Sequence, residues 1–254
     1  MDRGFNLSID AQSFASNSAT VANYKAQNKR DVESLAQLML DKDTVDAELV
    51  IKTLFPTISA DIFLSHSHAD QDLAISLAIE LERRCGLKVF IDSCVWGAAH
   101  DLLQVIDDKY CKSPGEINYN YSERNRSTAH VHMILSTALQ RMIDSTDTLF
   151  FLNTEQSISL KHSVDGSKKT LSPWIHMELE FSSMVRRQPR RHMVKSHDGR
   201  MYDSIGTESY NVAHEAPVRH LVNLAQPEFM MWVEATSRIG AVDGINLLYE
   251  IESA

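Results

Sequence analysis

The sequence has few cysteines and no long apolar run, and both absences narrow its class. Of its 254 residues only three are cysteines, Cys85, Cys94 and Cys111, and no two of them form a Cys-x-x-Cys pair. An odd and unpaired set does not predict a disulfide framework and favours a reducing compartment. No segment approaches the roughly 18 uninterrupted apolar residues of a membrane span, and the first twenty residues lack the apolar core of a secretory signal. We therefore expect a cytoplasmic protein with no membrane partner.

Several motifs of nucleotide and acyl chemistry are also missing. There is no glycine-rich phosphate loop or dinucleotide fingerprint, which disfavours an NAD-dependent oxidoreductase. There is no Gly-x-Ser-x-Gly elbow, which weakens the case for a Ser-His-Asp hydrolase. The pairs His66/His68 and His130/His132 are each two residues apart, and no cysteine or carboxylate set completes four ligands. The sequence therefore predicts neither a metal nor a bound cofactor.

The charge is predominantly acidic. A formal net charge of −9 argues against a general nucleic-acid binder, because the phosphate backbone attracts basic proteins. One stretch, 185–200 ("VRRQPRRHMVKSHDGR"), is strongly basic. It can be interpreted as a solvated surface loop or as a phosphate-contacting patch, and the first interpretation is the commoner one for charge runs.

Short apolar runs alternate with helical patterns through the middle of the chain. Residues 60–65, 87–92 and 147–153 predict buried strands, with Leu64, Phe90 and Phe150 largely buried on three different strands. Residues 69–85 and 127–145 show helical periodicity, and Gly86 is placed to cap the first of these helices. Strands that alternate with helices indicate βαβ units and a parallel sheet. The predicted fold class is α/β, with a doubly wound parallel sheet.

The flanking segments are harder to assign. Residues 1–30 predict a loose polar arm or a poorly packed helix, and 31–55 predict one long helix or two short ones before Pro56. Residues 208–212 are a possible last strand, and 226–251 predict one or two closing helices. The predicted division is an N-terminal arm and helical extension over 1–57 and a main domain over 58–254, with an insertion at about 93–126. We expect the extension to contribute to assembly more than to the sheet.

Three polar stretches should meet at one edge of this sheet, because ligands of such sheets bind outside the carboxyl ends of the strands. They are "SHSHAD" (65–70), "DSCVWG" (92–97) and "SPWIHME" (172–178). Pro173 suits the first turn of a helix, and Trp174 and Glu178 then share one face, since they are four residues apart. Glu180 is turned away from that face. Glu178 is either a site carboxylate or an ordinary exposed helix residue.

The neighbouring candidates also have two interpretations. Ser65, His66 and Ser67 could hydrogen-bond a phosphate or a ribose, while Ser67 could instead cap the helix that follows. Trp96 with Gly97 could be a packed anchor of its loop or part of the binding site. Residue types alone leave both open.

Three segments together resemble the Toll/interleukin-1 receptor (TIR) family. They are "ADIFLSHSHADQDLAISLAIELERRCGLKVFID" (60–92), "IDSTDTLFFLNTEQSIS" (143–159) and "SPWIHMELE" (172–180), and the last is similar to the Ser-x-Trp-x-x-x-Glu element of TIR domains that cleave NAD. The resemblance covers roughly residues 58–190. Residues 1–57 and 93–126 depart from the shorter receptor-type domain. The resemblance implies a flavodoxin-like TIR fold.

The resemblance also implies an activity and its residues. NAD would be the substrate, Glu178 the catalytic carboxylate, Trp174 an apolar wall of the pocket, and Trp96 and Gly97 part of a loop over the nucleotide. Cleavage of the nicotinamide–ribose bond passes through an oxocarbenium-like sugar, which one nearby carboxylate can stabilise.

Two classes of function remain at this stage. An enzyme resembling the TIR protein of Thoeris antiphage systems would make a cyclic or conjugated ADP-ribose signal for a separate effector protein and would act as a homo-oligomer. The alternative is a non-catalytic TIR adaptor that acts by TIR–TIR association.

Overall fold

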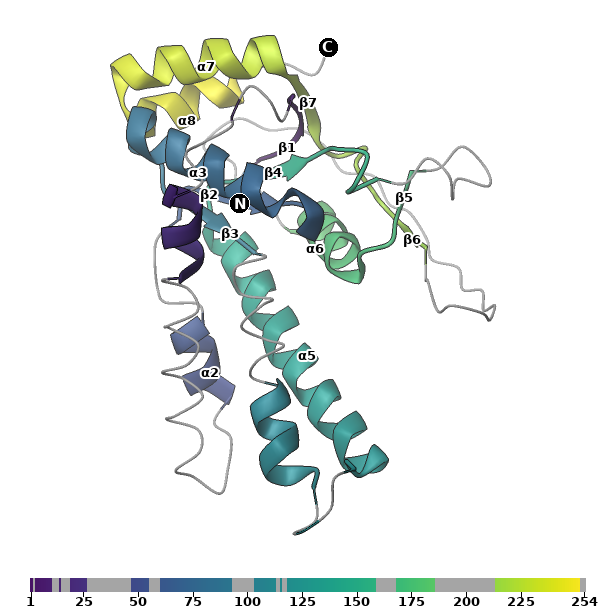
Figure 1. Ribbon diagram of the computed structural model, residues 1–254. Coiled ribbons are helices and arrows are strands. Elements are labelled where there is room, and N and C mark those ends of the chain that lie inside the picture. The colour runs from purple at the N-terminus through teal and green to yellow at the C-terminus, as the bar shows by residue number, and fades with distance from the viewer. Residues whose placement is uncertain are drawn as a thin grey trace.

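The computed structural model has a parallel sheet of five strands at its centre. It describes residues 1, 3–10, 14, 19–26, 47–54, 60–92, 103–112, 115, 118–158, 168–185 and 213–251. The strands are β1 (Arg3–Ser8), β2 (Ile62–Ser65), β3 (Val89–Ile91), β4 (Thr148–Leu152) and β7 (Val222–Ala225). They are ordered β3-β2-β4-β1-β7, and each neighbouring pair is parallel (Figure 1). The three strands expected in the middle of the chain are confirmed.

Strand β1 is the main departure from the sequence prediction. The polar composition of 1–30 predicts a loose arm or a poorly packed helix, whereas Arg3–Ser8 pairs with β4 on one side and β7 on the other. Phe5 and Leu7 have no exposed surface, and Phe5 meets Phe150 edge-on at 5.8 Å between ring centroids. The prediction is wrong for these residues because a six-residue strand can be buried by distant partners that its neighbours in sequence do not reveal.

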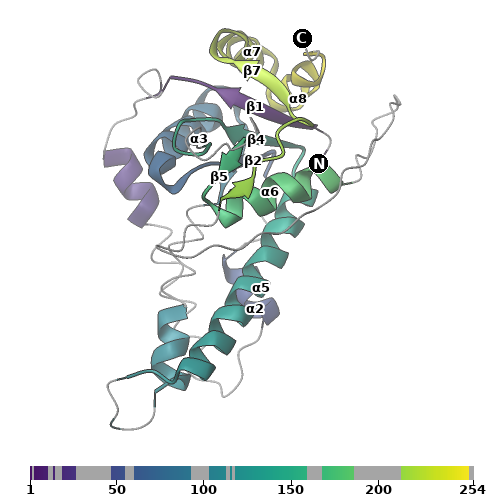
Figure 2. The ribbon, with the colours of Figure 1, turned by 90° about the vertical axis from the view of Figure 1, so that its right-hand side faces the viewer.

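Helices cover both faces of the sheet, as a doubly wound fold requires. On one face α3 (Gln71–Cys85), α7 (Gln226–Ile239) and α8 (Ala241–Tyr249) share a core with Phe5, Leu64 and Phe150. On the other face α5 (Tyr121–Ser145) and α6 (Pro173–Met184) share a second core with Phe63 and Phe151. Figure 2 shows these two layers on either side of the strands. The predicted fold class is confirmed at this level.

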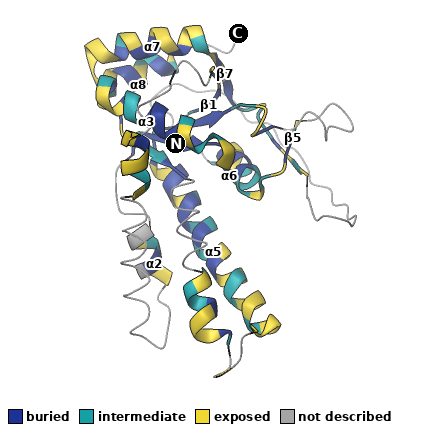
Figure 3. Cartoon of the chain, viewed as in Figure 1, coloured by how far each residue is buried: buried dark blue, intermediate teal, exposed yellow. Residues whose placement is uncertain are grey.

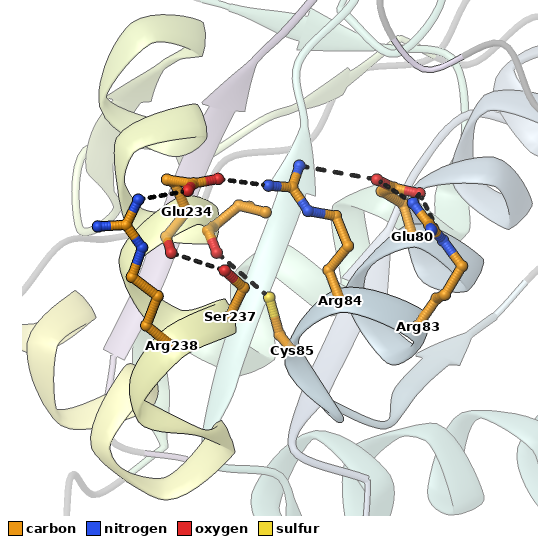
Figure 4. Close-up of polar contacts among 8 residues, drawn as sticks. Glu80, Arg83, Arg84, Cys85, Glu234, Ser237 and Arg238 are labelled. Atoms are coloured by element: carbon orange, nitrogen blue, oxygen red, sulfur yellow. Dashed lines mark hydrogen bonds and ion pairs between the residues drawn. The ribbon is translucent and has the colours of Figure 1, made fainter.

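Polar contacts join α3 to α7 over the first of these faces (Figure 4). The Arg84 guanidinium lies 2.7 Å from a Glu234 carboxylate oxygen and 3.7 Å from one of Glu80. Below it the buried Cys85 thiol donates to the Val233 carbonyl at 3.6 Å. These contacts fix the register of α3 against α7.

The helix ends follow the local sequence. Gly86 ends α3 in the left-handed conformation, with φ of 69°, and its N–H donates to the Glu82 and Leu81 carbonyls. At the start of α6, Ser172 accepts from the Ile175 N–H at 3.3 Å and Pro173 occupies the first turn. Both predicted boundaries are confirmed.

Helix α5 begins at Tyr121, earlier than the predicted residue 127, and extends well beyond the sheet. Residues 103–110, inside the insertion expected at 93–126, are helical and lie beside its distal half (Figures 1 and 2). The buried residues of α5 are near the sheet, and the N-terminal half of α5 is largely exposed (Figure 3).

The short helix α2 (Ala47–Leu54) packs along α5. Val50 is buried in the core that α5 shares, and Glu48 forms an ion pair with Arg141 at 3.1 Å. The rest of the helical pattern predicted over 31–55 lies outside the described residues. Val50 and Ile51 of α2 therefore pack against their own chain.

Phe90 is less buried than predicted. Leu64 and Phe150 have no exposed surface, but Phe90 is only partly buried because β3 is the edge strand of the sheet. Its ring packs against Phe63 at 5.4 Å.

The C-terminal part is confirmed in its helices, α7 and α8, and it also contains β7, a strand that the sequence did not predict. The possible strand at 208–212 lies outside the described residues, as does most of the basic stretch 185–200. A small antiparallel pair, β5 (Lys169–Thr170) and β6 (His214–Glu215), flanks α6. Within the described ranges no helix is both long and apolar enough to cross a membrane.

Candidate functional site

Four polar side chains meet at the carboxyl ends of β2 and β3. Ser65 is the last residue of β2 and His66 follows it, Asp92 follows β3 directly, and Glu178 is contributed by α6. All four are buried, with exposed fractions of 0%, 3%, 2% and 0% respectively. Burial of so many polar groups is costly unless they bind one another or a ligand.

Glu178 occupies a core position of its helix. The buried face of α6 consists of Ile175, Glu178, Leu179 and Ser182, which follow the spacing of one helical stripe. The Ser65 hydroxyl donates to Oε2 of Glu178 at 2.6 Å. The helix start at Pro173 therefore fixes a rotation that directs a carboxyl group toward the end of β2, and the interpretation of Glu178 as an exposed residue is wrong.

His66 and Asp92 form a buried pair beside Glu178. Nδ1 of His66 lies 2.8 Å from Oδ1 of Asp92 and 3.3 Å from the Leu64 carbonyl. The adjacent strands β2 and β3, with Leu64 opposite Ile91, bring the two residues together just past the last paired positions. An imidazolium beside a carboxylate satisfies both charges in an environment without water.

The environment of Glu178 favours its neutral form. Burial raises the pKa of its carboxyl group well above the usual value of 4.5, and the charge of Asp92 raises it further, while the Ser65 hydrogen bond opposes both. Oε1 of Glu178 accepts no hydrogen bond within the described ranges, but the Asp92 carboxyl group lies within hydrogen-bonding range.

His66 favours its charged form despite its burial. Burial alone lowers the pKa of an imidazole, but the attraction of Asp92 and its hydrogen bond outweigh this and raise the pKa of His66 above 6.5. The site thus favours the charged form of His66 and the neutral form of Glu178.

The loop after β4 is tied to the same edge of the sheet. The Thr154 hydroxyl donates to Asp70 at 2.5 Å, and Asp70 belongs to η2 (His68–Asp70) between β2 and α3. The Ser157 hydroxyl donates to the Leu152 carbonyl at 2.8 Å. These bonds fix the loops that follow β2 and β4 relative to each other.

Two of the remaining sequence candidates, Ser67 and Trp174, make contacts of their own. Ser67 caps η2, since its hydroxyl accepts from the Ala69 N–H at 3.2 Å, and the capping interpretation is confirmed. Trp174 is half-buried, and its ring lies 5.1 Å from that of His132 on α5. Trp96 and Gly97 lie outside the described residues.

Asp92 is the residue that sequence reasoning missed as a site residue. It is the first polar residue after the second strand, and it stands at the edge where Ser65 and His66 follow the first strand. That position was a usable signal, because adjacent parallel strands end side by side.

In the described part of the chain, no group of three or more His, Cys, Asp or Glu side chains is arranged to hold a metal ion. The chain matches no protein-family model, no curated protein and no solved structure. The arrangement of side chains is therefore the basis for a functional proposal.

Proposed function

We propose that this chain is a TIR-type enzyme that cleaves the nicotinamide–ribose bond of NAD, with Glu178 as the catalytic carboxylate. The observation that supports it best is the position of Glu178, a buried carboxyl group hydrogen-bonded to Ser65 at the carboxyl end of the sheet. An acidic residue in a core position lowers stability, and such residues concentrate at functional sites.

The location agrees with the rule for ligand sites in open α/β sheets. From β2 the chain passes through α3 to β3 on one side, and it then returns through α5 to β4 on the other side of β2. The connections on either side of β2 therefore diverge, and in open α/β sheets ligands bind at such a point, outside the carboxyl ends of the strands. Ser65, His66 and Asp92 all stand at this point, and α6 brings Glu178 to it.

The chemistry requires one carboxylate near the reacting ribose. As the glycosidic C–N bond breaks, its electron pair leaves with nicotinamide, which becomes neutral, and positive charge develops on the ribose. An ionised Glu178 would stabilise that charge, and the Ser65 hydroxyl would hold the carboxylate in place. Attack by water gives ADP-ribose and a proton, and attack by a group of the same or another nucleotide gives a cyclic or conjugated product.

The proposal also covers the biological role of the product and the residues around the reacting centre. The product would act as a signal in antiphage defence, read by a separate effector protein, and the enzyme would act as a homo-oligomer in the cytoplasm. Trp174, Ser67, Trp96 and Gly97 would contact the nucleotide outside the reacting centre. His66 would act through Asp92, since it is buried against that residue.

The test is release of nicotinamide from NAD labelled in its nicotinamide ring, followed by mass spectrometry with purified protein over a range of concentrations. Free labelled nicotinamide together with an ADP-ribose product supports the proposal, and the mass of that product distinguishes hydrolysis from cyclisation or conjugation. Intact NAD at every concentration, with and without nucleotides extracted from infected cells, would favour the adaptor.

A further inference from the structure

Asp92, the residue that follows β3, lies beside the proposed catalytic carboxyl group. We propose that Asp92, held in place by His66, is a positioning residue that shares one proton with Glu178, so that the resting site is electrically neutral and Glu178 ionises when this proton leaves. The inference rests on the proposed role of Glu178 and extends it to how the carboxyl group is switched on.

His66 and Glu178 both contact Asp92. His66 Nδ1 lies 2.8 Å from Asp92 Oδ1, and Asp92 lies within hydrogen-bonding range of Glu178. The far oxygen of Glu178, Oε2, accepts from Ser65 at 2.6 Å. Since Ser65 donates to Oε2, the proton that Glu178 and Asp92 share has its place on the side of Oε1, which accepts no bond from the described residues.

Charge balance fixes the number of protons. Three groups with exposed fractions of 0–3% cannot hold two adjacent negative charges without water. With His66 protonated, Asp92 ionised and Glu178 neutral, the total charge is zero and each charge has a partner. Removal of the shared proton leaves one net negative charge, which is the state that a positively charged ligand would stabilise.

The surrounding charges are consistent with this assignment. From η2, Asp70 adds a weaker attraction for the His66 cation, and its carboxylate is also bound by Thr154. From β2 comes Ser65, and from the end of β3 comes Asp92. On α6 itself the next acidic residue, Glu180, is only half-buried and is offset by two positions.

This arrangement couples substrate binding to proton release. The nicotinamide ring of oxidised NAD is cationic, so it can replace the shared proton as the partner of the ionised Glu178. The reduced dinucleotide has a neutral ring and cannot. The plot of kcat/KM against pH should therefore fall toward low pH, and this acidic limb should report the ionisation of the Asp92–Glu178 pair.

Two substitutions should move this limb in opposite directions. Asp92→Asn removes the neighbouring negative charge, so Glu178 loses its proton more easily and the limb of kcat/KM should move to lower pH by one unit or more, a tenfold change in proton affinity. His66→Gln removes the cation that balances Asp92, so the pair holds its proton more tightly and the limb should move to higher pH. Structural damage alone lowers the rate without moving the limb, and an unmoved limb in both variants would overturn the inference.

A measurement without NAD keeps the inference separate from the proposed function. Carbon-13 NMR of protein labelled at the glutamate side-chain carboxyl groups, with Glu178 assigned from the Glu178→Gln spectrum, should show Glu178 titrating well above the usual range and moving down in Asp92→Asn. Titration of Glu178 in the ordinary range in the wild-type chain would disprove the shared proton, whether or not NAD is cleaved. If Glu178 titrates as expected but no nicotinamide is released, the shared proton is supported and the proposed cleavage of NAD is contradicted. Because the wild-type spectrum is itself decisive, the inference stays testable if Asp92→Asn does not fold.

Discussion

At the residue scale, Glu178 has the features of a site residue and lacks those of a stabilising one. It takes a position on the buried stripe of α6 where an apolar side chain would pack, and it has one hydroxyl donor, Ser65. A helical pattern in the sequence identifies the helix but treats any glutamate as polar and exposed. The burial of Glu178 and the pairing of His66 with Asp92 could not be read from periodicity, because both depend on how α6 and β3 meet β2.

The pH dependence of stability tests this burial directly. The folded-state pKa of Glu178 is raised above its unfolded value, so its contribution to stability is present at low pH and is lost as the pH rises through the folded pKa. Glu178→Gln cannot ionise, so the variant should be more stable than the wild type at pH 8 and close to it at pH 5. Each unit of pKa shift corresponds to about 1.4 kcal/mol.

Chemical denaturation at the two pH values measures the difference. Glu180→Gln, on the same helix but half-buried, is the matched control, and its stability should follow that of the wild type at both pH values. Equal stabilities of Glu178→Gln and the wild type at pH 8 would contradict the raised pKa. His66, whose pKa is also raised, adds a loss of stability at high pH that is common to all three proteins.

At the element scale, the helices and the central strands followed from local sequence. The spacing of apolar residues in α3, the cap at Gly86 and the start of α6 at Pro173 are local properties, and all are present. The order of the strands is not local. Strand β1 pairs with β4, which is more than 140 residues away in sequence, and no pattern within residues 3–8 indicates that partner.

The packing of α7 on α8 gives a prediction at this scale. A Cβ atom at Gly244 would lie 2.1 Å from Cγ2 and 2.8 Å from Cβ of Thr236, so the two helices meet there without room for a side chain. The Trp232 indole also donates to the Gly244 carbonyl at 2.7 Å. Gly244→Ala should cost about 1–3 kcal/mol, the range for overpacking.

Urea denaturation would measure this cost. Val242→Ala, on the same helix but 72% exposed, should change the stability by less than about 0.5 kcal/mol. A Gly244→Ala variant as stable as the wild type would mean that α8 does not pack as described.

At the scale of the whole molecule, the N-terminal strand belongs to the sheet. The sheet takes strands from both sides of the boundary expected at residue 57, and β1 separates β4 from β7. Removal of residues 1–55 would therefore open the sheet at its interior and would not merely alter assembly, as the sequence alone suggests.

Two phenylalanine substitutions compare the interior with the edge. Phe5→Ala, on β1 with no exposed surface, should cost about 3–5 kcal/mol. Phe90→Ala, on the half-buried edge strand, should cost roughly half as much, because part of its area already faces solvent. Thermal unfolding of the two variants would rank them, and a smaller loss for Phe5→Ala would contradict the interior position of β1.

Release of nicotinamide from NAD by Glu178→Gln, relative to wild type, tests the central claim most directly. Glu180→Gln serves as the matched control, and Glu178→Gln must be shown to fold. The account predicts that Glu178→Gln loses about three orders of magnitude in turnover, as expected for a contact that stabilises the transition state, while Glu180→Gln stays close to wild type. Turnover by Glu178→Gln above about a tenth of the wild-type rate would show that Glu178 is not the catalytic carboxylate.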